Sequence, residues 1–151
     1  MKKSYSLLWC TMLALALAAT GCKEKVKPVS ERIAKAWTAE SVKHGSTVVY
    51  TRGGSNNTTP AYSAFRLTLN DAAGTKTATY TEFDGNTFTG SWDVENDNKL
   101  ILTGLTPAPT GSGGRIEFTI TSIEDARVVL TRLTTSPKTG GSINEYTLTN
   151  P

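Results

Sequence analysis

Cysteine and histidine are scarce in this chain, which has two cysteines and one histidine. Cys10 lies in an apolar stretch near the N-terminus, so Cys22 is the only cysteine after that stretch. A zinc site needs several ligands at recognisable spacing, and a serine or cysteine nucleophile needs a positioned base. His44 alone meets neither need, and we interpret it as a residue of a surface turn. We expect a protein that is not an enzyme, with no metal, no cofactor and no intrachain disulfide.

An excess of charge of one sign is also missing. The chain has 16 basic and 13 acidic residues, and Lys2 and Lys3 are the only charged residues before Cys22. The remainder of the chain is therefore close to neutral. Because phosphate neutralisation dominates the affinity of proteins for nucleic acid, we expect no nucleic-acid partner.

No apolar run in the sequence reaches the length of about 20 residues that a helix needs to span a bilayer. The longest run, residues 7–19, contains the polar Thr11 and follows Lys2 and Lys3. A basic start, a short apolar middle and small residues at the end predict a secretory signal rather than a membrane-spanning helix.

Two cleavage sites compete at the end of this run. Residues 16–18, Ala-Leu-Ala, fit the small-x-small pattern of ordinary signal cleavage. Residues 19–22, Ala-Thr-Gly-Cys, resemble the lipobox of bacterial lipoproteins, with alanine in place of the usual Leu, Val or Ile. Lipidation also explains a lone cysteine in an exported protein. We predict a lipoprotein signal peptide over residues 1–21, a Cys22 that carries acyl chains such as palmitate, and a charged linker over residues 22–32.

Strong helix formers are sparse after residue 45, where threonine, β-branched and aromatic residues favour strands. Alternating apolar positions, separated by Gly, Asn and Asp turns, predict about eight or nine strands. They cover residues 37–42, 47–51, 63–70, 76–83, 87–94, 99–104, 115–123, 127–133 and 143–150. Before them, we expect a short helix over residues 30–37 that is capped by Ser30.

Eight short antiparallel strands joined by hairpins can close into an up-and-down barrel, which leaves no exposed sheet edge. We therefore predict an all-β class and a single barrel domain over residues 33–151. Polar loops rich in Gly, Ser and Asn separate some of the strands, at residues 52–60, 107–114 and 134–142. Loops commonly carry recognition, so an envelope protein or a glycan that binds these loops is one expected partner.

Three runs resemble the lipocalin-like domains of Gram-negative lipoproteins: FRLTLNDAAGTKTATY, GSWDVENDNKLIL and FTITSIEDARVVLTR. The resemblance covers residues 33–149 and implies an antiparallel lipocalin-like barrel on a lipid anchor, with no defined reaction. It also implies a late arginine, Arg132 or else Arg127, that lies across Trp37 in a cation–π contact. We accordingly expect the protein at the cell envelope, at the outer membrane, with periplasmic and surface display both open.

A barrel of this size has an interior that is filled by side chains or holds one small ligand. The alternation predicts five inward residues, Phe65, Leu67, Leu69, Trp92 and Phe118, as the lining of a site for a small apolar molecule. The same five residues would form the core if the barrel is filled, and the sequence leaves both interpretations open. It also leaves open the oligomeric state.

Two further patterns suggest binding chemistry. The spacing of Asp93, Glu95 and Asp97 matches the start of a calcium loop, but the sixth and twelfth positions lack the required Gly and Glu, so we interpret the series as a hairpin turn. Among the aromatic residues, Trp37 and Trp92 are expected in the core. Tyr62, close to a proline, is the best candidate for an exposed ring that binds a sugar.

Overall fold

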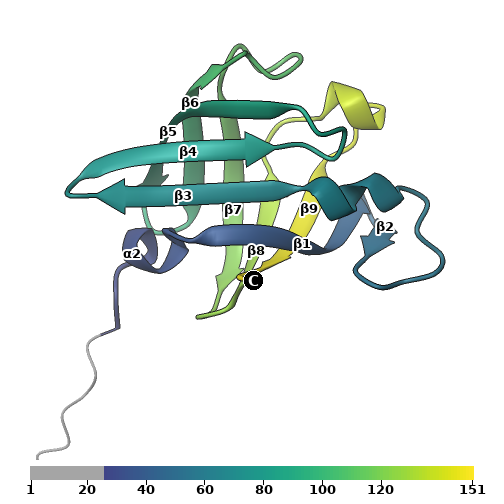
Figure 1. Cartoon of the computed structure of the whole chain (residues 1–151), viewed down its shortest axis with the longest axis horizontal. Helices are drawn as coiled ribbons and strands as arrows, with labels where there is room; N and C mark the ends of the chain where they lie inside the picture. Colours follow the sequence, from purple (N-terminus) through teal and green to yellow (C-terminus); the bar gives the residue numbers. More distant parts are fainter. Residues whose placement is uncertain (1–25) are drawn as a thin grey trace, which may run out of the picture.

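The computed structural model describes residues 26–151 (Figure 1). The predicted signal peptide over residues 1–21 and the predicted lipidation at Cys22 lie outside these residues. The chain enters the described part next to a short helix, α2 (Val29–Ile33), and then continues almost entirely as strands. None of the helices within residues 26–151 is long and apolar enough to cross a membrane.

Nine strands form a single antiparallel sheet, as the alternation of the sequence predicts. They are β1 (Ala36–His44), β2 (Thr47–Thr51), β3 (Arg66–Ala72), β4 (Thr75–Thr81), β5 (Thr87–Glu95), β6 (Lys99–Thr106), β7 (Ile116–Ile123), β8 (Arg127–Arg132) and β9 (Asn144–Thr149). Consecutive strands pair from β3 to β9, and β9 pairs back onto β1. The result is the all-β, antiparallel, up-and-down barrel that we expected, closed by eight strands.

The ninth strand, β2, lies outside this closed ring. The first part of β1 pairs with β3 through Ala36–Thr38, and its last part pairs with β2 through Ser41–His44. The side chain of Asn57 binds the open side of β2, accepting from the backbone N–H of Thr51 at 2.8 Å and donating to its carbonyl at 2.9 Å. The loop after β2 thus occupies an edge that would otherwise be available for pairing with another chain.

The predicted helix over residues 30–37 is wrong in its extent. Helix α2 ends at Ile33, and Ser30 forms no cap because the N-cap position is Pro28. Residues from Ala36 onward pair with β3 instead, so Trp37 belongs to β1. The Trp37 indole N–H donates to the carbonyl of Ile33 at 2.8 Å and thereby joins the end of the helix to the barrel. Pairing in the sheet has overridden a weak local helix preference.

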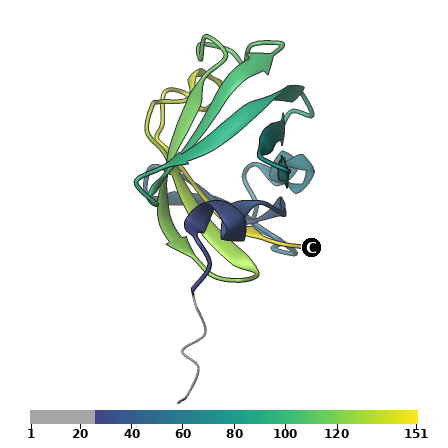
Figure 2. The same cartoon turned by 90° about the vertical axis from the view of Figure 1, so that its left-hand side faces the viewer.

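Helix α2 closes one end of the barrel. Its Ile33 is fully buried, and the helix contacts β5 and β7. Viewed from this side, α2 lies in front of the barrel (Figure 2). The two short 3-10 helices, η2 (Pro60–Ala64) and η3 (Pro137–Thr139), lie at the opposite end (Figure 1). We refer to that opposite end as the loop end.

Candidate binding site at the loop end of the barrel

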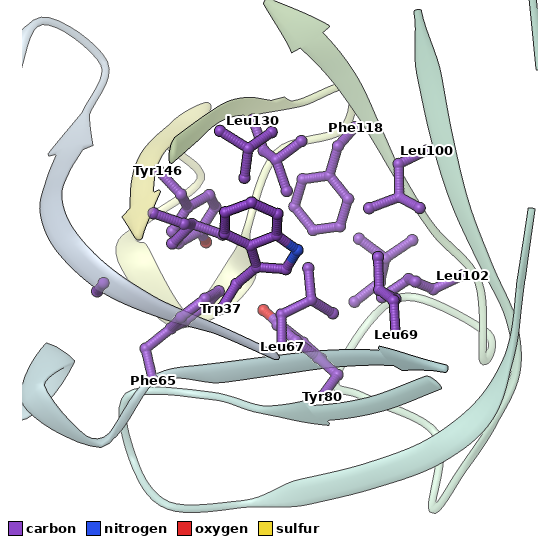
Figure 3. Close-up of a cluster of buried hydrophobic side chains, with 14 of the residues drawn as sticks. Trp37, Phe65, Leu67, Leu69, Tyr80, Leu100, Leu102, Phe118, Leu130 and Tyr146 are labelled. Carbon is purple, nitrogen blue, oxygen red and sulfur yellow. The ribbon is translucent and has the colours of Figure 1, made fainter. Parts of the chain in front are cut away.

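The interior of the barrel is lined by alternate residues of the eight strands of the closed ring, and large apolar side chains meet along its axis (Figure 3). The five residues predicted to line a ligand site are all buried, with exposed fractions between 0 and 2%: Phe65, Leu67, Leu69, Trp92 and Phe118. All five belong to a single hydrophobic core cluster. Phe65 and Phe118 both contact the ring of Tyr146, whereas Trp92 donates its indole N–H to the carbonyl of Asn70 at 2.9 Å.

A connected group of aromatic rings occupies the loop end. Neighbouring centroids lie between 4.9 and 6.3 Å apart. We call this group the aromatic cluster; it comprises Tyr50, Tyr62, Phe65, Tyr80, Phe83, Phe88, Phe118 and Tyr146. Ring pairs at these distances contribute about 0.5–1.5 kcal/mol each beyond the burial of their area.

Tyr62 is the member of the cluster that lies in η2. It is 1% exposed, so the prediction of an exposed, sugar-binding ring is wrong. The other four residues of η2 are exposed, and Tyr62 alone turns inward. Its ring contacts Tyr50, Phe83 and Tyr146. Sequence reasoning missed this position because η2 follows neither the period of a strand nor that of a long helix.

His44 lies beside Tyr62 at the end of β1, rather than in the surface turn that we expected. Its Nε2 atom is 2.7 Å from the Tyr62 hydroxyl, and the two rings meet edge to face. Burial lowers the pKa of His44 below its ordinary value. A neutral imidazole can accept a hydrogen bond from the tyrosine hydroxyl at this nitrogen.

Two carboxylates at this end share one lysine. Lys138 Nζ lies 2.5 Å from Glu82 Oε2, as an ion pair rather than a directed hydrogen bond, and donates to Asp84 at 2.6 Å. Burial raises the pKa of Asp84, but hydrogen bonds from Lys138 and Asn86 outweigh this effect and lower it overall. Burial likewise opposes the charge of Lys138, yet the two carboxylates raise its pKa.

Arg132 is the other charged side chain in this region, and its position differs from the one that the resemblance implies. The cation over the Trp37 ring is Lys35, at 5.9 Å from the centroid, and Arg127 pairs with Glu40 at 3.2 Å. Arg132 ends β8, opposite Phe118 in the register, and only 3% of it is exposed. Its positive charge partly offsets the rise that burial causes in the pKa of Tyr62, Tyr80 and Tyr146.

The three tyrosines nevertheless keep their protons. Burial is the largest effect on Tyr62, Tyr80 and Tyr146, and it raises the pKa of each above the ordinary value. Their hydroxyls are therefore neutral near pH 7.

Two residues of the acidic series, both at the end of β5, form surface ion pairs. Asp93 pairs with Lys76 at 2.6 Å, and Glu95 pairs with Lys99 at 2.5 Å. Within residues 26–151, no group of three or more His, Cys, Asp or Glu side chains is arranged to hold a metal ion.

Comparison with known proteins gives a limited picture. No family model matches the sequence, and no curated protein is similar to it. Among solved structures, the chain is similar to a lipocalin-like protein from Bacteroides uniformis, with 13% sequence identity and a TM-score of 0.49. The match covers 80% of this chain and 99% of that protein.

Proposed function

We propose that this protein is a non-catalytic binding protein of the cell envelope, which takes a small, largely apolar molecule at the loop end of its barrel. The observation that carries the proposal is the position of Tyr62. Its ring lies inside the barrel mouth among Tyr50, Phe83 and Tyr146, but it is attached to a surface segment rather than to a strand. Movement of that segment would leave an apolar space with aromatic walls.

The backbone of this segment forms few hydrogen bonds with the rest of the barrel. The backbone hydrogen bonds of Tyr62 and Phe65 are local to η2, and Thr59 donates to the carbonyl of Val49 at 3.0 Å. The Tyr62 side chain holds the segment through its contacts with His44, Tyr50, Phe83 and Tyr146. Segments whose backbone hydrogen bonds are mainly local open at a lower free-energy cost than paired strands, as ligand-gating loops must. An apolar ligand that binds the open form would take the place of the Tyr62 ring.

Binding of a neutral apolar dye tests this proposal. Within residues 26–151, the strand pairings lie between Ala36 and Thr149 and the buried core lies between Ile33 and Leu148, so residues 23–151 contain this barrel and can be prepared without lipid. We expect the fluorescence of N-phenyl-1-naphthylamine to rise on saturable binding, and we expect Tyr62→Ala to bind it at least several-fold more tightly.

Tyr62→Phe is the matched control, because it keeps the ring and loses only the hydroxyl that contacts His44. It should bind the dye like the wild type or slightly more tightly. If neither the wild type nor Tyr62→Ala binds the dye while both remain folded by circular dichroism, the interior is a closed core and the proposal is wrong.

We also propose that acyl chains on Cys22 hold the barrel at the outer membrane. The described chain starts beside α2, so an anchor upstream would place the α2 end toward the membrane and the loop end away from it. Mass spectrometry of the N-terminal peptide distinguishes lipidation at Cys22 from cleavage after residue 18. Cys22→Ser should release the protein from the membrane fraction, and retention of this variant in that fraction would contradict the anchor.

Recognition through a loop is the second candidate. The loop after β2 lines a surface hollow together with Val48 and Thr51, and residues 54–57 form its polar wall. Val48 is 52% exposed there. An envelope protein or glycan that binds this hollow should lose affinity when Val48 is changed to Asp, whereas dye binding at the barrel mouth should be unaffected.

A further inference from the structure

Arg132 is a buried cation without a direct counterion. Only 3% of the residue is exposed, and its Nε atom has no hydrogen-bond partner. Arg132 takes part in none of the ion pairs formed within residues 26–151. A buried charge is costly unless it is paired and hydrogen-bonded, and side chains such as arginine are almost never fully buried alone.

The carboxylates nearby do not remove this cost. Glu82 and Arg132 both influence the same three tyrosines, so they share one region of the interior. Glu82, however, is in direct contact with Lys138, and Asp84 binds Lys138 and Asn86. Lys138 thus attracts both carboxylates, and neither reaches the guanidinium.

The surroundings of Arg132 suit the binding of an apolar molecule that carries an anionic group. Arg132 lies opposite Phe118 of the aromatic cluster in the register of β7 and β8, and its charge acts on Tyr62, Tyr80 and Tyr146, whose hydroxyls stay protonated. A ligand that displaces the Tyr62 ring would bring its own polar group next to Arg132. A guanidinium binds a carboxylate in a fixed, bidentate geometry, and charge-assisted hydrogen bonds of this kind are stronger than neutral ones.

We infer that Arg132 binds the acidic group of the ligand, and that the ligand class is an apolar molecule with one carboxylate or an equivalent single negative charge. The inference rests on the proposed function, since it assigns a chemical class to the molecule that enters the same site.

Two competitors that have the same alkyl chain but differ in charge provide the test. Dodecanoate and dodecan-1-ol are each titrated against N-phenyl-1-naphthylamine bound to residues 23–151. For the wild type, we expect dodecanoate to displace the dye at a concentration about 10-fold lower or more, as a charge-assisted hydrogen bond implies. Arg132→Met should bring the two concentrations close together, while Arg132→Lys should retain part of the preference.

Arg127→Met is the matched control, because Arg127 is on the same strand but lies on the outer surface and pairs with Glu40. It should keep the full preference for dodecanoate. If the wild type binds the dye but releases it equally to both competitors, or if Arg132→Met keeps the preference, Arg132 is not the anion-binding residue and the proposed function still stands. If no variant binds the dye, both proposals are overturned.

Discussion

The Nε2 atom of His44 lies 2.7 Å from the hydroxyl of Tyr62, and this contact links the end of β1 to the 3-10 helix that fills the barrel mouth. The two residues are 18 positions apart in the chain. His44 is also the only histidine of the protein. The contact therefore links the buried position of Tyr62 to the one side chain type whose ordinary pKa lies close to neutral pH.

Mild acid should weaken the fold through His44. Burial lowers the pKa of His44 in the folded state, so the unfolded chain takes up a proton first. The stability that neutral His44 contributes is complete above the pKa of about 6.5 that a histidine has in the unfolded chain. It is lost as the pH falls from that value through the lower pKa of His44 in the folded state. Urea unfolding at pH 7.5 and pH 5.5 measures the loss, and His44→Gln should reduce it. An equal pH dependence in the variant would show that carboxylates alone cause the effect.

Lys138→Met should be strongly destabilising. The change leaves Glu82 as a buried carboxylate without its ion pair, and breaking such a pair costs about 3 kcal/mol in the free energy of unfolding. Lys99→Met is the matched control, because its pair with Glu95 is more exposed and should cost less than about 1 kcal/mol. Chemical denaturation of both variants at pH 7 gives the comparison, and similar losses would contradict a special role for Lys138.

Arg132→Met should raise stability, in contrast to Lys138→Met. The substitution removes a buried charge that has no ion pair and keeps much of its volume, so we expect a gain of about 1–3 kcal/mol in the unfolding free energy. Denaturation of the protein without ligand measures this gain. A loss of several kcal/mol would instead mean that Arg132 is stabilised by charges within the protein, and the need for an external anion would disappear.

Gly90→Ala should destabilise the contact between β5 and β6. The pairing of these strands is irregular between Thr89 and Ser91, and a Cβ atom on Gly90 would lie 2.5 Å from the carbonyl oxygen of Thr103. Backbone must shift to accept it, at a cost of about 1–3 kcal/mol. Ser91→Ala, on the exposed neighbour, should stay within about 0.5 kcal/mol. Thermal unfolding compares the two variants, and equal midpoints would show that a Cβ atom at position 90 is tolerated.

The strands and the barrel were predictable from sequence because alternation is a local property. Phe65, Leu67 and Leu69 face inward wherever β3 pairs, since side chains of a strand alternate between its two faces. The turn residues between strands act equally locally. The resemblance of three runs to lipocalin-like domains further supported the prediction that the strands close into one ring.

The candidate site depended on contacts between residues that are distant in sequence. Tyr62 is buried because β1, β2, β9 and Phe83 surround the place where η2 folds back, and nothing in Pro60–Ala64 encodes that neighbourhood. The unpaired state of Arg132 could not be predicted from sequence either. Its alternating position in β8 places it inward, but only the structure shows that Lys138 binds the nearby carboxylates. Periodicity specifies the face of a strand on which a side chain lies, whereas its partners across the barrel arise only when all eight strands have closed.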